Sequence, residues 1–88
     1  HVPRIVKHFF DAGKPIAAIC HAAQILSTIP EVLQGRELTA YIACKPEVKA
    51  AGGTYVDKPL HVDRNLVSGH AWPDLPGFMR EFIALLEK

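Results

Sequence analysis

Most features that mark a specialised class of protein are missing from this 88-residue sequence. It has only two cysteines, too few for a disulfide-dense secreted module, so we expect a reducing, cytoplasmic location. No apolar run approaches the ~20 residues that a membrane helix needs. The net charge is only +1, and the basic residues form no stripe. Nothing therefore favours nucleic acid or an anionic membrane as a partner. The metal-binding patterns HExxH and CxxC are absent as well, so the sequence indicates no metal or other cofactor.

A starting methionine is also missing. The chain begins with His1, and its one methionine is Met79. Its composition, with 49% hydrophobic and 22% charged residues, is that of an ordinary globular protein. A domain of this length would bury only about 60% of the surface of its unfolded chain. We therefore expect residues 1–88 to be a fragment, a processed chain or a part of something longer.

The most informative segment is Lys14–Ile25, with the sequence KPIAAICHAAQI. An apolar strand is predicted to end at Ile19 and a helix to begin shortly afterwards, so that Cys20 lies at a sharp strand-to-helix turn. Such a turn is a nucleophile elbow, which lifts one side chain out of the sheet and needs small neighbours. Alanines meet that need: Ala18, Ala22 and Ala23. The N-terminus of the helix would favour a thiolate, so Cys20 is the candidate nucleophile. The alternative is a small buried hydrophobic residue, which a free cysteine often is.

The spacing of the apolar residues predicts an alternation of helices and strands. Helices are expected over 3–12 with Gly13 as a left-handed cap, over 21–29, over 46–51, and over 75–86 with Asp74 as N-cap. Strands are expected over 15–19 and 38–42, an extended piece over 54–57, and a hairpin of 60–63 with 66–68. A turn is expected over 32–35.

This order of elements is typical of an α/β fold. The strand over 15–19 is apolar throughout, as expected for a strand that is covered on both faces of a parallel sheet. The few short strands make a poor sheet by themselves, and both terminal helices carry apolar stripes. We therefore expect further strands, from an N-terminal half or from another chain, to complete the fold.

Motifs in order along nearly the whole chain resemble those of the ThiJ/PfpI family. The segment AICHAAQ at 18–24 is similar to the family's elbow, AICHGPQ. The segments VLQGRELTAY at 32–41, AGGTYVD at 51–57 and VDRNLVS at 62–68 are similar to three further family motifs. The chain departs from the pattern at Ala22 and Ala23, which replace glycine and proline, and at His70, where many members have arginine.

The resemblance implies a flavodoxin-like three-layer α/β sandwich, similar to that of class I glutamine amidotransferases, with residues 1–88 as the C-terminal half of one domain. Family members usually form dimers or hexamers, so a homo-oligomer is implied. They are described as intracellular cysteine peptidases, glutathione-independent glyoxalases (glyoxalase III) and protein or nucleotide deglycases, some with stress or chaperone roles. The implied function is a cysteine-dependent hydrolase or lyase that attacks a peptide carbonyl or an α-oxoaldehyde.

The resemblance also assigns site residues. It implies that Cys20 is the nucleophile and His21 the catalytic histidine. The family's glutamate comes from the N-terminal half, so that half is the implied partner, and residues 1–88 alone are expected to be inactive. Tyr41 matches a position near the site in some peptidase-type members. Its place at the end of a predicted strand suits an α/β site, and equally suits a packing residue at the rim of the sheet.

Other interpretations stay open. The protein could be a redox sensor or chaperone-like stress protein in which Cys20 is oxidised and catalysis is marginal. The elbow also resembles the G-x-C-x-G-x-Q motif of class I glutamine amidotransferases, whose last position Gln24 fits, although both glycines are alanine here. Cys44 is expected to be an inert thiol. Surface or hydrogen-bonded roles are expected for His61 and His70, and a packing role for Tyr55.

Overall fold

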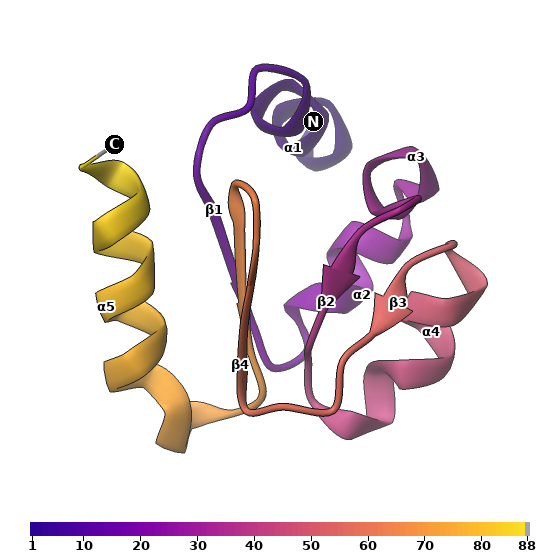
Figure 1. Ribbon diagram of the computed structural model, residues 1–88. Helices are drawn as coiled ribbons and strands as arrows, with labels where there is room; N and C mark the ends of the chain where they lie inside the picture. The colour runs from indigo at the N-terminus through magenta and orange to yellow at the C-terminus, as the bar shows by residue number, and fades with distance from the viewer. Residues whose placement is uncertain (88) are drawn as a thin grey trace.

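The computed structural model describes residues 1–87, without the side chain of Trp72. Helices and short strands alternate in it as the sequence predicts for an α/β fold (Figure 1). The helices are α1 (Val2–Asp11), α2 (Ala22–Ser27), α3 (Pro30–Leu33), α4 (Lys45–Ala50) and α5 (Leu75–Leu86), with short 3-10 helices η1 (Ile42–Cys44) and η2 (Trp72–Asp74). The strands are β1 (Ile16–Ile19), β2 (Glu37–Leu38), β3 (Thr54–Tyr55), β4 (Leu60–Asp63) and β5 (Leu66–Gly69).

The main sheet has the strand order β1-β5-β4. β1 runs parallel to β5, with Ile16 opposite Leu66 and Ile19 opposite Gly69. β4 and β5 form the antiparallel hairpin that the sequence predicts. β2 and β3 form a separate parallel pair. Among residues 1–87, no strand pairs with the other edge of β1, which leaves backbone groups at that edge available to another strand.

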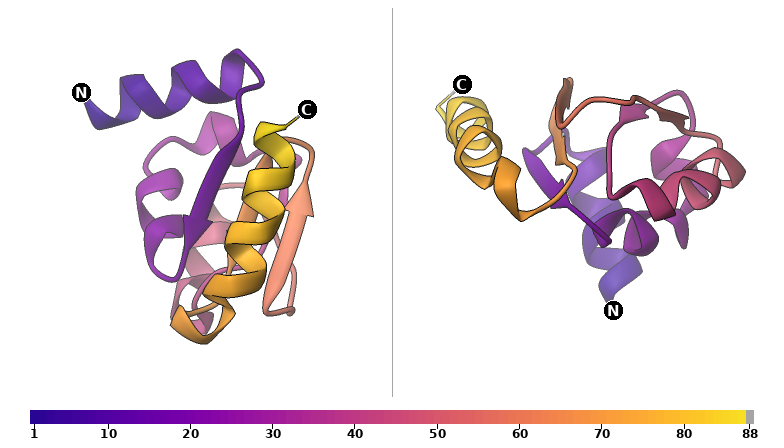
Figure 2. Two further views of the ribbon diagram at one scale, coloured as in Figure 1. Left: turned by 90° about the vertical axis from the view of Figure 1, so that its left-hand side faces the viewer. Right: turned by 90° about the horizontal axis from the view of Figure 1, so that it is seen from below.

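Helices lie on both sides of the main sheet. α5 packs on all three of its strands, whereas α2 packs on β1 from the opposite side. The right-hand view of Figure 2 shows the sheet between α5 and the other helices. The hydrophobic core lies on the α2 side, where α2, α3 and α4 meet the strands, and its largest fully buried side chains are Leu33, Leu38, Val48 and Leu66. This core fixes the position of α2, and with it the turn that precedes α2.

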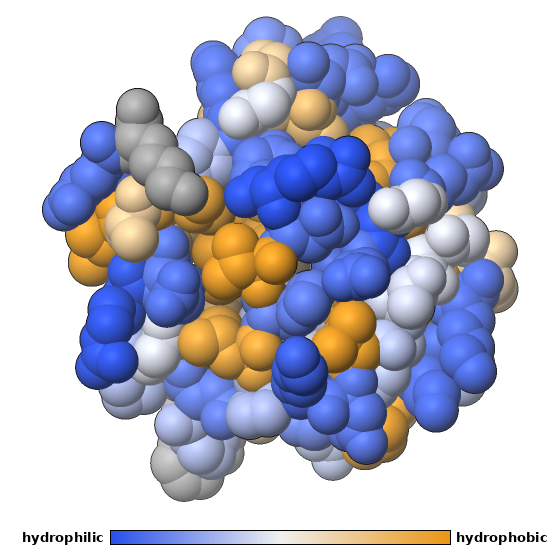
Figure 3. Space-filling view, viewed as in Figure 1, coloured by the Kyte–Doolittle hydropathy of each residue, from blue (hydrophilic) through white to orange (hydrophobic). Residues whose placement is uncertain are grey.

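Both terminal helices expose part of their apolar faces. On α1 the exposed residues are Val2, Ile5 and Phe9, and on α5 they are Leu75, Met79, Ile83 and Leu86. Figure 3 shows hydrophobic residues gathered between α5 and the hairpin on the face of the molecule seen there. Within residues 1–87, the apolar stripes predicted for these helices are thus only partly buried. None of the described helices is long enough and apolar enough to span a membrane.

Two of the predicted elements are wrong in extent. The strand predicted over 38–42 ends at Leu38, because the N–H of Thr39 donates to the Ser68 hydroxyl at 2.9 Å and leaves the ladder. Ile42 opens the 3-10 helix η1. Pro30 begins the one-turn helix α3 where a turn was predicted over 32–35, since proline at the first helical position lacks only an N–H that would have no partner.

Helices lie on both faces of β1, as predicted, but the strand is not fully buried within these residues. Ala18 is buried, but the other three residues of β1 are half-buried. β1 is an edge strand here, and an apolar groove lies beside it. The other predicted elements lie within two residues of their predicted bounds, and Gly13 after α1 is left-handed, with a φ of 68°. Asp74 precedes α5 as predicted, but its side chain makes no capping hydrogen bond and instead accepts from the N–H of Ala71 at 3.2 Å.

Candidate active site

Cys20 occupies the sharp turn between β1 and α2. Its φ of 59° lies in the left-handed region, which costs a non-glycine residue about 1–3 kcal/mol. Two backbone bonds hold it there: its N–H donates to Gly69 O at 3.0 Å, and its carbonyl accepts from Tyr41 N–H at 3.1 Å. The strand–turn–helix geometry predicted for Lys14–Ile25 is therefore confirmed, and a cysteine carries the strain.

Small residues allow the backbones to approach one another at the elbow. Ala18 and Ala23, two of the predicted small neighbours, are buried. A Cβ added to Gly69 would lie 3.1 Å from the Phe78 ring and 3.3 Å from the Ile19 side chain. Gly69 was not predicted to belong to the site, although a glycine in a strand is a recognised sign of close backbone approach. Gly69 therefore supports the elbow through its carbonyl and through its lack of a side chain.

The turn brings His21 to the Cys20 thiol. Side chains of sequence neighbours usually diverge, but here Cys20 Sγ lies 3.2 Å from His21 Nδ1. Cys20 is partly exposed and His21 is exposed, so a substrate can reach both. The thiol and the ring nitrogen lie within hydrogen-bonding distance of each other. This is the arrangement that a cysteine nucleophile and its base require.

The Tyr41 ring packs against one face of the His21 ring. The two rings stack with centroids 4.9 Å apart and an angle of 27° between their planes. The prediction that Tyr41 lies at the end of a strand is wrong. Tyr41 directly precedes η1 and is 40% exposed. Its ring lies at the site, and of the two interpretations of Tyr41 the structure favours a place near Cys20. Stacking restricts the rotation of the imidazole and keeps Nδ1 towards the thiol.

One backbone donor is also in place. The backbone hydrogen bonds within residues 1–87 leave the N–H of His21 without a carbonyl acceptor. This N–H directly follows the nucleophile in the chain, which is the usual position for one donor of an oxyanion hole.

The second cysteine lies in a very different environment. Cys44 is fully buried, and its thiol donates to the carbonyl of Cys20 over a long 4.0 Å. Burial raises the pKa of the Cys44 thiol, and the nearby Glu47 and Cys20 raise it further. A buried thiol that resists ionisation is a poor nucleophile. The structure agrees with the expected inert role of Cys44.

The remaining candidate residues make hydrogen bonds to other residues. His61 Nε2 lies 3.1 Å from Glu37 Oε1, and His70 Nε2 lies 2.9 Å from the Tyr55 hydroxyl. Both histidines are therefore hydrogen-bonded, as expected, whereas Tyr55 does more than pack. Residues 1–87 contain no group of three or more His, Cys, Asp and Glu side chains that could hold a metal ion.

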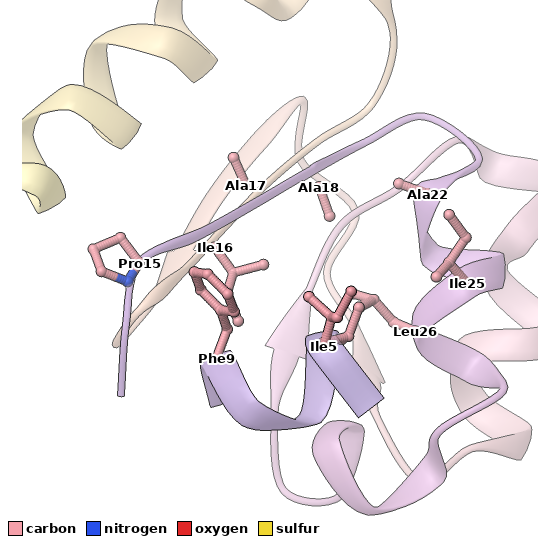
Figure 4. A pocket seen from close by; sticks show the side chains of 10 residues that line it. Ile5, Phe9, Pro15, Ile16, Ala17, Ala18, Ala22, Ile25 and Leu26 are labelled. Atoms are coloured by element: carbon pink, nitrogen blue, oxygen red, sulfur yellow. The ribbon is translucent and has the colours of Figure 1, made fainter. Parts of the chain in front are cut away.

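An apolar groove of about 260 Å³ lies next to the elbow, between α1, β1 and α2 (Figure 4). Ile5 and Phe9 border it on α1, β1 forms its floor, and Ile25 borders it on α2. Its lining side chains are all apolar, so the groove brings no catalytic group to Cys20. It coincides with the open edge of β1 and marks a surface suited to further apolar structure.

The profile of the DJ-1/PfpI family matches residues 1–85. The chain belongs to the DJ-1/PfpI family. The family resemblance seen in the elbow and in the motifs that follow it is thereby confirmed. The fold agrees: a two-domain protein from Anabaena variabilis with a DJ-1/ThiJ/PfpI-like and a ferritin-like domain superposes with a TM-score of 0.91. That protein is 33% identical, and the match covers 97% of this chain and 24% of the other.

Relatives in the DJ-1/PfpI family extend beyond the matched region. Protein DJ-1 homolog D of Arabidopsis thaliana is 47% identical, with 98% of this chain and 23% of the relative covered. Deglycase PfpI of Pyrococcus furiosus is 42% identical, with 94% of this chain and 49% of the relative covered. The chain thus spans at most about half the length of these relatives.

Proposed function

We propose that Cys20 is the nucleophile of a DJ-1/PfpI-type hydrolase or lyase that attacks a carbonyl group. The substrates proposed are α-oxoaldehydes and the adducts they form with amines or thiols, with peptide bonds as a second substrate class. One observation carries the proposal. A partly exposed cysteine in a left-handed turn has its sulfur 3.2 Å from a histidine nitrogen. The name deglycase of the Pyrococcus furiosus relative supports the choice of substrate class.

The proposed reaction uses these groups in sequence. His21 Nδ1 takes the thiol proton, and the Cys20 sulfur forms a bond to the carbonyl carbon of the substrate. The carbonyl oxygen gains negative charge, which the N–H of His21 stabilises. With a peptide bond, the imidazolium returns a proton to the leaving amine as its bond to carbon breaks, and water hydrolyses the resulting thioester to a carboxylic acid and the free thiol. With an α-oxoaldehyde no group leaves: the addition gives a hemithioacetal, a base moves the proton from the former aldehyde carbon to the neighbouring carbonyl carbon, and the thioester of a 2-hydroxy acid results. Water hydrolyses that thioester to the 2-hydroxy acid and restores the thiol.

We propose in addition that residues 1–88 act as the C-terminal half of one domain, with an N-terminal half that supplies a glutamate to the site. The open edge of β1, the adjoining apolar groove and the coverage of about half of the Pyrococcus furiosus relative support this. A homo-oligomer, dimer or hexamer, and a cytoplasmic location belong to the same proposal. Sedimentation of the protein that contains both halves tests the oligomeric state.

The test is turnover of methylglyoxal and of a methylglyoxal-modified amino acid by the protein with both halves. Replacing the nucleophile, Cys20→Ser, is expected to reduce kcat by at least about a thousandfold. Cys44→Ser is the matched control, because a buried serine keeps a donor to the Cys20 carbonyl, and its kcat should stay within about twofold of the unmodified protein. Equal losses from both substitutions would contradict the assignment of the nucleophile.

A redox-sensing role is the second candidate, favoured by the contrast between a partly exposed Cys20 and a buried Cys44. Stoichiometric oxidation of Cys20 by hydrogen peroxide without turnover of any carbonyl substrate would support it. Turnover that depends on Cys20 would support the enzyme instead.

A further inference from the structure

Tyr55 and His70 form a second histidine-containing pair. The hydroxyl of Tyr55, on β3, lies 3.1 Å from the carbonyl of Ala40 and 2.9 Å from His70 Nε2. A carbonyl only accepts, so the single hydroxyl proton goes to Ala40. The Tyr55 oxygen must then accept from His70, which places a proton on His70 Nε2. Both bonds of the hydroxyl have a defined direction.

The pair connects the two segments that hold the elbow. Ala40 is buried and directly precedes Tyr41, whose ring stacks on His21. At the other end, His70 directly follows Gly69, whose carbonyl accepts from the N–H of Cys20. The bonds from Tyr55 therefore tie the loop that carries Tyr41 to the end of β5 that anchors Cys20.

The loop is tied on both sides of Ala40. The Thr39 N–H donates to the Ser68 hydroxyl at 2.9 Å, and the Tyr41 N–H donates to the Cys20 carbonyl at 3.1 Å. Between these two anchors, the buried carbonyl of Ala40 accepts from Tyr55. Loss of that donor leaves a buried acceptor unsatisfied, and the peptide between Ala40 and Tyr41 must rotate or move to find water.

We propose that Tyr55 and His70 are positioning residues, which fix the Tyr41 ring and through it the orientation of the His21 imidazole beside Cys20. For catalysis this rests on the proposed function, but the orientation of the ring does not. His70 keeps its side chain on Tyr55 while its own N–H donates to the Pro59 carbonyl at 3.0 Å. Lys45 Nζ lies 5.7 Å from the centre of the Tyr55 ring and adds a further contact to the half-buried pair.

The test compares Tyr55→Phe, His70→Ala and His70→Gln in the protein with both halves. The first readout is the NMR spectrum of the histidine rings, because stacking on Tyr41 shifts the His21 ring resonances. Tyr55→Phe and His70→Ala are expected to move these resonances towards their positions in Tyr41→Leu. His70→Gln places an amide N–H near the former Nε2 and should restore them. His61→Gln is the control, since His61 bonds to Glu37 instead.

The second readout is the kinetics with methylglyoxal. Tyr55→Phe is expected to lower kcat about tenfold and to leave KM within about twofold, as misplacement of a catalytic group does. If the unmodified protein shows no turnover, the proposed function fails while the NMR comparison still decides the positioning role. Unchanged His21 resonances in folded Tyr55→Phe and His70→Ala would overturn the proposal. Should Tyr55→Phe not fold, the contrast between His70→Ala and His70→Gln decides.

Discussion

Two left-handed residues lie at opposite ends of the β1–β5 pair. Cys20, after β1, has a φ of 59°, and Arg64, in the turn before β5, has a φ of 56°. The Arg64 side chain donates to the neighbouring Asp63 carboxylate at 3.0 Å and reaches the carbonyl of Gly35. The Cys20 thiol faces a histidine nitrogen at 3.2 Å.

The two ends share a backbone conformation and differ in what their side chains can do. The polar groups of the hairpin turn bond mainly to one another and to nearby carbonyls: Arg36 donates to Asn65, and Asn65 donates to the Lys14 carbonyl. That arrangement satisfies polar groups and stabilises a turn. At the elbow, a cysteine thiol and a histidine nitrogen face each other at a partly exposed position. Backbone strain is common to both ends, so the paired thiol and imidazole are what make the elbow the candidate site.

Among the predictions that test this difference between the two ends, the largest expected effect is the loss of activity when the Tyr41 ring beside the elbow is removed. Tyr41→Leu removes the stack on His21, which is worth about 0.5–1.5 kcal/mol and thus up to about tenfold in kcat/KM. Tyr41→Phe is the matched control, because a phenyl ring keeps the stack and should keep most of the activity. Steady-state kinetics with methylglyoxal measures both. Similar losses in the two variants would show that the hydroxyl of Tyr41, and not its ring, matters.

The second prediction tests whether the two backbones are equally strained. Cys20→Gly is expected to be more stable to urea than Cys20→Ala by about 1 kcal/mol, because glycine adopts the left-handed region freely. Arg64→Gly should be more stable to urea than Arg64→Ala by a similar amount. Because both variants at each position lack the native side chain, the difference between them reports the backbone strain alone. If glycine is more stabilising than alanine at position 64 but not at position 20, the elbow is not left-handed in solution.

The smallest expected effect concerns acid stability at the hairpin turn. Burial raises the pKa of Asp63, but the hydrogen bonds from Arg64 and from the N–H of Glu37, with the charges of Arg64 and Arg36, outweigh it and lower the pKa. The unfolded chain therefore binds the proton more readily, and stability rises with pH. The contribution, of about 1 kcal/mol, is present above the unfolded pKa of about 3.9 and is lost as pH falls through the lower folded pKa.

Urea unfolding between pH 7 and pH 3 measures this term. Asp63→Asn should be less stable than the unmodified protein at pH 7, and the difference should shrink as the pH falls below 4. Asp57→Asn, at an exposed carboxylate, should show neither effect. A difference that stays constant down to pH 3 would mean that the carboxylate charge of Asp63 does not stabilise the turn.

Local sequence patterns predicted the elbow because its causes are local. An apolar strand, a cysteine and a run of alanines within about ten positions are enough to place a tight turn, and the structure confirms this turn at Cys20. The hairpin follows similarly from alternating apolar residues and the polar pair Arg64-Asn65. The resemblance to family motifs added the roles of Cys20 and His21, which remain predictions.

Contacts between distant segments could not be predicted from local sequence patterns. The stack of Tyr41 on His21 joins residues 20 positions apart and depends on where β2 ends. That end was predicted wrongly, because the Ser68 hydroxyl takes the N–H of Thr39 in place of a strand partner. The bonds from Tyr55 to Ala40 and His70 likewise depend on the tertiary arrangement of β3 and β5. Periodicity carries no information on such pairs.

The central claim is that the elbow makes one of two cysteines reactive. Alkylation of the native protein by iodoacetamide at mildly acidic pH, with peptide mass mapping, tests it most directly. We expect Cys20 to be modified at least about a hundredfold faster than Cys44, whose burial requires local unfolding before reaction. Equally slow modification of both cysteines in folded protein, or faster modification of Cys44, would contradict the account.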